Sequence, residues 1–204
     1  MSDIRCVLFD IGGVLVDWHM SWITSEISKQ FEINEDIVTN AFSKHLHDLD
    51  SGKINEKIFW QKIAHDTNSI PLKENTESLW DIYFRKRAKL NHDVINLAKT
   101  IKEKSYTIGI ISNIEKITHK VVDDWKVLTI FENKFLSYQI GFSKPDPKIY
   151  EYVIEKLPFD SNQMLFVDDK ESNIDAAKSS GMNAIHFTNC SELEKSLFSY
   201  GIRI

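Results

Sequence analysis

Residues 6–13 read CVLFDIGG: four apolar residues, then an aspartate, an isoleucine and two glycines. A short, uninterrupted apolar run that is closed by polar and glycine residues is typical of a strand buried on both faces of a sheet. Asp10 would then lie just beyond the carboxyl end of this strand, and Gly12 and Gly13 would allow the backbone to approach a ligand closely. The segment therefore predicts a buried strand with a carboxylate at its end.

Four more short apolar runs rich in β-branched and aromatic residues follow along the chain, at Tyr106–Ile111, Lys134–Tyr138, Met164–Val167 and Asn183–Phe187. Helix-length segments with apolar residues three or four apart, such as residues 94–101, lie between them. Strands that alternate with helices indicate βαβ crossovers and a parallel sheet covered on both faces. The predicted fold class is α/β, with a Rossmann-like core.

Residues 18–90 break this alternation, because they show helical patterns and no convincing strand. We expect a core domain formed by residues 1–16 and 91–204, and an inserted α-helical cap domain at residues 17–90. Such a cap can close over a site on the core and contact the organic part of a small ligand. Candidate contacts are Trp18, His19, His45 and His47.

The composition is that of a folded soluble chain: 204 residues, 42% hydrophobic and 27% charged. A net charge of −5 argues against a nucleic-acid partner, because such binding needs clustered basic residues. The two cysteines, Cys6 and Cys190, have no disulfide or metal-ligand spacing, which favours a reducing compartment. The N-terminal apolar run is too short for a secretory signal, and no run is long enough to span a membrane. We therefore expect a cytoplasmic protein without a membrane partner, and the sequence does not indicate its oligomeric state.

Chemically active residues follow four of the predicted strands. Ligands of open α/β sheets bind outside the carboxyl ends of the strands, so these residues are expected to converge at one edge. They are Asp10, the pair Ser112-Asn113, the segment Gly141-Phe142-Ser143-Lys144-Pro145, and the pair Asp168-Asp169.

This set of residues suits a phosphate ester. Two carboxylates can hold a divalent cation, while a lysine, a hydroxyl and backbone N–H groups surround phosphoryl oxygens, which leaves one carboxylate free to attack. Adjacent carboxylates such as Asp168 and Asp169 repel each other unless a cation or donors compensate. Oxygen ligands favour Mg²⁺, and no zinc ligand set is present. Ser112-Asn113 is also a common helix cap, so this pair alone leaves both readings open.

Four stretches resemble the haloacid dehalogenase-like (HAD) hydrolase superfamily, in the order typical of that family. They are FDIGGVLVD at residues 9–17, IISN at 110–113, GFSKPDPKIY at 141–150 and FVDDKESNIDAAKSSGM at 166–182. The resemblance covers nearly the whole chain and implies a Rossmann-like core with an inserted cap. It also implies a hydrolase.

The resemblance implies catalytic and substrate-binding roles. Asp10 matches the nucleophile that attacks phosphorus and forms an aspartyl-phosphate, which water then hydrolyses. Lys144 matches the lysine that neutralises charge on the nucleophile and the phosphoryl group. Ser112 matches a hydroxyl that binds a phosphoryl oxygen, and Asn113 and Gly13 would present donors to the substrate.

The resemblance also implies a Mg²⁺ site. Asp169 matches the direct ligand, and Asp168 matches either a residue just behind the ligands or an alternative ligand. The carboxylate of Asp10 and the backbone carbonyl of Gly12 would complete the protein's share of the ligands. Asn173 matches a residue that orients the water molecules around the metal.

Position 12 departs from the family pattern. Most phosphatases of this family have a second aspartate two residues after the nucleophile, which protonates the leaving oxygen, whereas this chain has Gly12. A general acid of this kind typically accelerates the reaction by about 10²–10⁴-fold. Either Asp17 or a cap residue substitutes for it, or the leaving group needs little protonation, or catalysis has been lost. A subgroup with Asp-x-Gly in this motif includes phosphatases of sugar 1-phosphates, and this chain resembles that subgroup.

The predicted function is Mg²⁺-dependent hydrolysis of a small phosphorylated metabolite, such as a sugar phosphate, through an aspartyl-phosphate. A 2-haloacid dehalogenase is an alternative, although Gly12 and the Asp168-Asp169 pair do not resemble that metal-free branch. The second alternative is a catalytically silent binding protein with the same fold. Retention of Asp10, Lys144 and Asp169 argues against it, because a silent protein needs no nucleophile.

Overall fold

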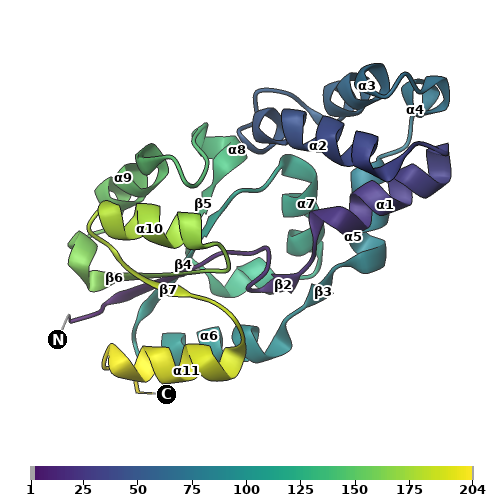
Figure 1. Cartoon of the computed structure of the whole chain (residues 1–204). Coiled ribbons are helices and arrows are strands. Elements are labelled where there is room, and N and C mark those ends of the chain that lie inside the picture. Colours follow the sequence, from purple (N-terminus) through teal and green to yellow (C-terminus); the bar gives the residue numbers. More distant parts are fainter. Residues whose placement is uncertain (1–2, 204) are drawn as a thin grey trace.

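A computed structural model describes residues 3–203, and a five-stranded parallel sheet forms its centre. The strand order is β5-β4-β1-β6-β7, so the strand that contains the first apolar run is central (Figure 1). The predicted α/β, Rossmann-like core is confirmed. The strands are β1 (Cys6–Phe9), β4 (Thr107–Ser112), β5 (Asn133–Leu136), β6 (Met164–Asp168) and β7 (Asn183–His186).

The register brings the carboxyl ends of the three central strands to one edge. Phe9, the last residue of β1, is paired with Ile110 of β4 and Val167 of β6. Asp10 and Asp168 directly follow two of these positions, and Ser112 comes two residues after the third, so all three lie at the carboxyl edge of the sheet, where ligands of such sheets bind.

Helices cover both faces of the sheet, which explains the continuously apolar strands. Side chains of a strand alternate between the two faces. In β1, Val7 and Phe9 join the buried cluster on the face covered by α6 (His92–Glu103), α7 (Lys116–Asp124) and α11 (Cys190–Ser199). The intervening residues of β1 pack on the other face, against α9 (Pro147–Lys156) and α10 (Glu171–Ser179).

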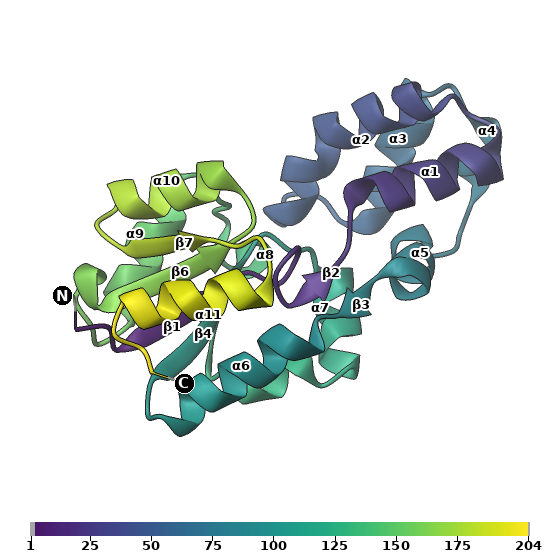
Figure 2. The same cartoon turned by 60° about the horizontal axis from the view of Figure 1, so that its bottom comes forward.

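Five helices, which lie in the sequence between Asp17 and Lys89, form a separate bundle beside the carboxyl edge of the sheet (Figure 2). The centre of the bundle is aromatic. The ring of Phe42 stacks on that of Trp80, with centroids 5.3 Å apart, and meets the ring of Phe59 edge-to-face, with centroids 4.9 Å apart. Trp80 also joins the bundle to the core, because its indole N–H donates to Thr118 Oγ1 of α7 at 2.7 Å. The helices are α1 (Met20–Phe31), α2 (Glu35–Asp50), α3 (Glu56–Asp66), α4 (Ile70–Glu74) and α5 (Leu79–Arg87).

Two short antiparallel strands connect the bundle to the core: β2 (Val16–Asp17) pairs with β3 (Lys89–Leu90). The sequence showed no convincing strand in residues 18–90, so β3 was missed. A strand of two residues contains no repeating pattern from which it could be recognised. Here it is formed by pairing with a partner distant in the sequence.

The predicted strand Lys134–Tyr138 is wrong at its C-terminal end. β5 stops at Leu136, and Ser137 begins the short helix α8 (Ser137–Ile140), which ends at Gly141 with a φ of 83°. The buried Ser137 hydroxyl accepts the N–H of Ile114 at 2.9 Å, a tertiary contact that the local pattern does not contain. The remaining helical segments are the 3₁₀ turns at Val127–Ile130 and Ser161–Gln163. None of the helices within residues 3–203 is sufficiently long and apolar to cross a bilayer.

Candidate active site

Asp10 lies at the centre of the carboxyl edge, and backbone bonds hold it there. Its N–H donates to the carbonyl of Val167 at 2.9 Å, and its Oδ1 accepts the N–H of Ile11 at 2.7 Å. The residue is only 6% exposed. Burial raises the pKa of Asp10 to about 6, against the lowering effect of Lys144, while the charge of Asp168 raises the pKa further. A compensating positive charge at this place would keep the carboxylate ionised.

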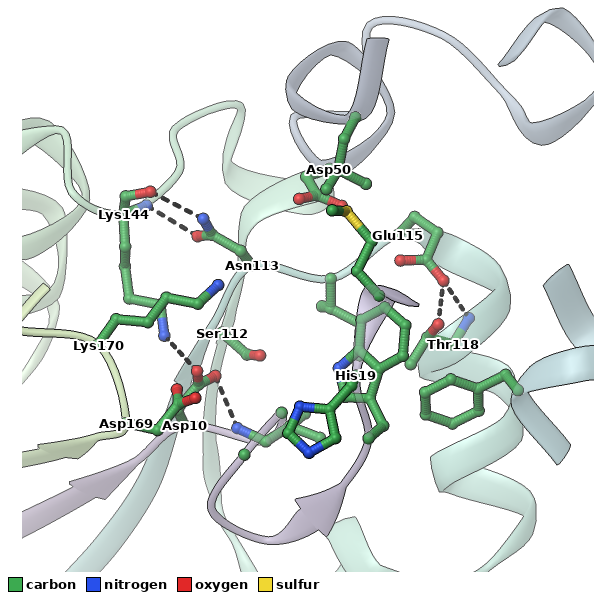
Figure 3. A pocket seen from close by; sticks show the side chains of 18 of the residues that line it. Asp10, His19, Asp50, Ser112, Asn113, Glu115, Thr118, Lys144, Asp169 and Lys170 are labelled. Carbon is green, nitrogen blue, oxygen red and sulfur yellow. Dashed lines mark hydrogen bonds and ion pairs between the residues drawn. The ribbon is translucent and has the colours of Figure 1, made fainter. Parts of the chain in front are cut away.

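Lys144 bridges two of the carboxylates. Its Nζ lies 2.9 Å from Asp10 Oδ2 and 2.6 Å from Asp168 Oδ2 (Figure 3 shows the bond to Asp10). Burial lowers the pKa of Lys144, but the charges of Asp10 and Asp168 more than offset this effect, and the net shift is upward. Lys144 therefore stays a cation at the point where an incoming phosphoryl anion would add negative charge.

Asn113 holds the backbone of Lys144. Its Nδ2 donates to the Lys144 carbonyl at 2.8 Å, and its Oδ1 accepts the Lys144 N–H at 2.7 Å (Figure 3). Asn113 was predicted to present backbone or side-chain donors to the substrate; its side-chain amide already forms two hydrogen bonds within the protein. Asn113 positions the lysine, while the buried Ser112 hydroxyl stands near the Asp10 carboxylate (Figure 3) and helps to lower the pKa of Asp10.

Asp168 is fully buried and surrounded by donors. Besides Lys144, it accepts the backbone N–H of Lys170 at 2.8 Å and the side-chain amide of Asn173 at 3.0 Å from each oxygen. Burial raises the pKa of Asp168, but the charge of Lys144 and these hydrogen bonds together lower it, so the net shift is downward. The side-chain amide of Asn173 thus holds the Asp168 carboxylate, and its role in orienting water around a metal stays a prediction.

Asp169 has the opposite surroundings. Its Oδ1 is buried, and no residue within 3–203 forms a hydrogen bond with it. Burial raises the pKa of Asp169, and so does the charge of Asp168. A buried carboxylate oxygen without a donor is costly unless a cation completes its surroundings. Ligand oxygens of Asp10, Asp168 and Asp169 all lie within 4.8 Å of one another, which fits a hard cation such as Mg²⁺.

The two glycines after Asp10 leave no room for side chains. Gly13 has a φ of 76°, and a Cβ there would lie 2.3 Å from Oδ2 of Asp169. A Cβ on Gly12 would lie 2.8 Å from Nε1 of Trp18, an indole that packs against Trp80 with ring centroids 6.0 Å apart. The indole of Trp18 therefore occupies the space into which a side chain at position 12 would project.

Gly12→Asp is accordingly expected to lower the free energy of unfolding by about 1–3 kcal/mol, because the new side chain overlaps a packed indole. The double variant Gly12→Asp/Trp18→Ala should be less destabilised than the sum of the two single variants, because the overlap is gone. Urea denaturation of the four proteins measures this coupling. Simple additivity would contradict the proposed overlap.

A cavity of about 340 Å³ opens in front of these residues and is closed on its other side by the helical bundle. Of the four cap residues predicted to contact a ligand, Trp18 and His19 line it. His45 and His47 do not. His45 pairs instead with Asp66 at 2.9 Å, and His47 with Ser143 at 3.1 Å.

Asp17, the predicted substitute for the missing acid at position 12, is not among the residues that line the cavity. Its side chain is 61% exposed and lies 3.7 Å from Nε2 of His19. Strand β2 turns this side chain outward, since the neighbouring Val16 is buried and strand side chains alternate.

Two acidic residues of the cavity were not predicted: Asp50 at the C-terminus of α2 and Glu115 at the start of α7 (Figure 3). Glu115 is 4% exposed, and its Oε1 accepts the N–H of Thr118 at 2.8 Å as a helix cap. Burial raises the pKa of Glu115 to about 7. Glu115 follows Ser112-Asn113 closely, which offered a weak signal. Asp50 offered none, because it ends a helix of the insert.

The raised pKa of Glu115 predicts a pH-dependent stability. Below pH 4.5 the carboxyl is neutral in both states; between 4.5 and about 7 the folded protein keeps a proton that the unfolded chain releases. The free energy of unfolding should therefore fall as the pH rises through this window, by up to about 3 kcal/mol from this group. Glu115→Gln should show a smaller decline between pH 5 and pH 8 in urea denaturation. An equal decline in both proteins would contradict the assignment.

The fold and the carboxylate–lysine centre define an α/β enzyme with a helical insert over its site. The family model of haloacid dehalogenase-like hydrolases matches residues 4–181. The chain belongs to this family and is a hydrolase, as the four motifs predicted.

Relatives and solved structures agree with this placement. The chain is 25% identical to a D-ribitol-5-phosphate phosphatase of Bacteroides thetaiotaomicron, with 95% of this chain and 97% of the relative covered. It is 24% identical to the sesquiterpene phosphatase astK of Aspergillus oryzae, with 95% and 97% covered. A HAD family enzyme of B. thetaiotaomicron, solved as a magnesium complex, superposes with a TM-score of 0.80 at 23% identity over 96% of this chain and 98% of that one.

Proposed function

We propose that this chain is a Mg²⁺-dependent phosphatase that hydrolyses a small phosphomonoester through an aspartyl-phosphate on Asp10. The observation that carries the proposal is the meeting of Asp10, the buried cation of Lys144 and the unpartnered oxygen of Asp169 at one sheet edge. The phosphatase names of two relatives that align over nearly their whole length support it.

Asp10 and Asp169 are the carboxylates that would hold Mg²⁺, together with the backbone carbonyl of Gly12. Asp168 contributes less directly, because Lys144 and Asn173 already occupy its oxygens. When bound, Mg²⁺ supplies positive charge to the phosphoryl oxygens and to the nucleophile.

The chain's own residues supply the remaining steps. A carboxylate oxygen of Asp10 forms a bond to phosphorus while the bond from phosphorus to the ester oxygen breaks, and that oxygen leaves with a proton from water. Water then attacks the phosphorus and releases inorganic phosphate and the free carboxylate. Lys144 and Ser112 balance the charge on the phosphoryl oxygens, and the cavity wall excludes bulk water.

Neither position 12 nor position 17 supplies an acid that could protonate the leaving oxygen. Gly12 has no side chain, and Asp17 is exposed outside the cavity. A leaving oxygen of low basicity, as in a sugar 1-phosphate, needs the least help. The size of the cavity favours a small phosphorylated sugar or polyol, as does the name of the D-ribitol-5-phosphate phosphatase.

A dehalogenase is the weaker candidate. An L-2-haloacid dehalogenase of Xanthobacter autotrophicus superposes with a TM-score of 0.63 at 18% identity, over 98% of this chain and 85% of that one, a likeness of fold alone. The unpartnered oxygen of Asp169 favours a cation-dependent site, and a halocarboxylate would add an anion without one. Phosphate release from phenyl phosphate with Mg²⁺, compared with halide release from 2-chloropropionate, decides between the two functions.

Asp169→Asn is expected to raise the Mg²⁺ concentration that gives half-maximal phosphate release by roughly 10–100-fold, because one anionic ligand is lost. A Mg²⁺ titration of activity measures the shift. Asp175→Asn changes an exposed carboxylate of α10 and serves as the matched control. An unshifted Mg²⁺ requirement in Asp169→Asn would remove this residue from the proposed metal site.

A further inference from the structure

Two carboxyl groups from segments far apart in the sequence face the same cavity as Asp10. Asp50 comes from the end of α2 in the bundle, and Glu115 from the start of α7 in the core. Both lie on the side of the cavity away from Asp10 and Lys144 (Figure 3). They are therefore placed to meet the organic part of a substrate whose phosphoryl group is at Asp10.

Ser137 holds the two segments together. Its buried hydroxyl donates to the backbone carbonyl of Asp50 and accepts the N–H of Ile114 at 2.9 Å, next to Glu115. The chain comes equally close just after α2, where a Cβ on Gly52 would lie 2.6 Å from the carbonyl oxygen of Tyr138. The juxtaposition of Asp50 and Glu115 is thus built by tertiary hydrogen bonds.

The carboxyl groups have unused hydrogen-bonding capacity. Both contacts of Glu115 with Thr118 use Oε1, and no other residue within 3–203 donates to Oε2, which is turned toward the cavity (Figure 3). Asp50 accepts the hydrogen bond from Ser137 through its backbone carbonyl, so this bond does not use its carboxyl group. Burial raises the pKa of Asp50 well above its usual range, and the charge of Glu115 adds to this effect. Glu115 is buried and Asp50 is half-buried, and both line the cavity, so their free oxygens are accessible to a ligand or water there.

The rest of the wall indicates the chemistry of that ligand. The half-buried indole of Trp18, backed by the buried rings of Trp80 and Phe84, provides an apolar surface against which the C–H groups of a carbon chain or sugar ring can pack. Lys170 also lines the cavity, and its positive charge disfavours a second ammonium group there. A hydroxyl group can both donate and accept a hydrogen bond. It can therefore pair with the carboxyl groups of Asp50 and Glu115, whether protonated or ionised, and with the ammonium group of Lys170.

We propose that Asp50 and Glu115 bind hydroxyl groups of the substrate and so select a phosphorylated polyol or sugar over an unhydroxylated ester. This inference rests on the proposed phosphatase function and adds the residues that read the organic group. A site built to bind substrate hydroxyls discriminates strongly against analogues that lack them, because its polar groups are then left unpaired.

The test compares two probes, D-ribitol 5-phosphate and phenyl phosphate, in the presence of Mg²⁺. Glu115→Gln keeps an acceptor for Thr118, and Asp50→Asn keeps the backbone bond to Ser137, so both variants retain the observed hydrogen bonds. The ratio of kcat/KM for ribitol 5-phosphate to kcat/KM for phenyl phosphate should fall about 10-fold or more in each variant, mainly through KM. Asp48→Asn, a partly exposed carboxylate on the same helix, is the control and should leave the ratio unchanged.

Other outcomes separate this inference from the function on which it rests. An unchanged ratio of kcat/KM in both variants would overturn the role of Asp50 and Glu115 while the phosphatase function stands. The same holds if the wild type hydrolyses phenyl phosphate but no hydroxylated phosphate. Preference of the wild type for ethanolamine phosphate over ribitol 5-phosphate would overturn it in favour of a cationic substrate. Failure to release phosphate from any probe would refute the phosphatase function itself.

Discussion

Asp10→Asn is expected to lower kcat for phosphate release by about 10⁴-fold or more, while the protein remains folded. The amide cannot form the covalent bond to phosphorus, so the reaction loses its first step. The side chain is nearly isosteric, and its Oδ1 can still accept the N–H of Ile11. Stopped-time phosphate assays at saturating Mg²⁺ measure the loss, and circular dichroism checks the fold.

A further readout tests the covalent step itself. Brief incubation of the wild type with a ³²P-labelled phosphoester, followed by acid quenching, should trap label on the protein, whereas Asp10→Asn should trap none. The exposed carboxylate of α10 again provides the control, since Asp175→Asn should label normally. Undiminished turnover in Asp10→Asn would remove the nucleophile from the proposal, and with it the aspartyl-phosphate.

Lys144→Met should have the largest effect on stability. The Lys144 side chain is 1% exposed, and its ammonium group pairs with both Asp10 and Asp168, so the substitution leaves two buried carboxylates without their cation. Breaking a buried ion pair in this way costs about 3–5 kcal/mol. Urea denaturation at pH 7.5 measures the loss, and phosphatase activity should disappear with it.

The pH dependence identifies the cause of this destabilisation. Toward low pH the uncompensated carboxylates gain protons, so the difference in unfolding free energy between wild type and Lys144→Met should shrink. Lys99→Met replaces an exposed lysine of α6 and should stay within about 0.5 kcal/mol of the wild type. A difference for Lys144→Met that stays constant from pH 7.5 to pH 5 would contradict the electrostatic explanation.

The sequence predicted the core of the site because its members follow strands. Each of Asp10, Ser112 and Asp168 ends an apolar run, and in a parallel sheet the ends of neighbouring strands meet. The periodic pattern of the strands and the sheet rule together place these groups without further information. The ends of strands were predicted less accurately where a tertiary contact decides them. At Ser137, for example, the predicted strand ends and a short helix begins.

The function of Asn113 and Asn173 could not be read in the same way. Asn113 was predicted to present backbone or side-chain donors to the substrate, and Asn173 to orient the water around the metal. The structure adds that their side-chain amides hold the Lys144 backbone and the Asp168 carboxylate. An amide in a motif shows that a donor and an acceptor are present, but its partners depend on the rotamer and on the packing of the neighbouring loop.

The local pattern of residues alone determined the α/β class and the acidic edge of the sheet, because burial of apolar strands and the alternation of strand and helix act over short stretches of chain. Only the tertiary structure decided that the indole of Trp18 fills the space beside Gly12, that Asp17 is turned outward, and that Asp50 meets Glu115. These positions depend on how the helical bundle packs on the core. Helical periodicity shows that a face is apolar, but it does not show which surface that face will cover.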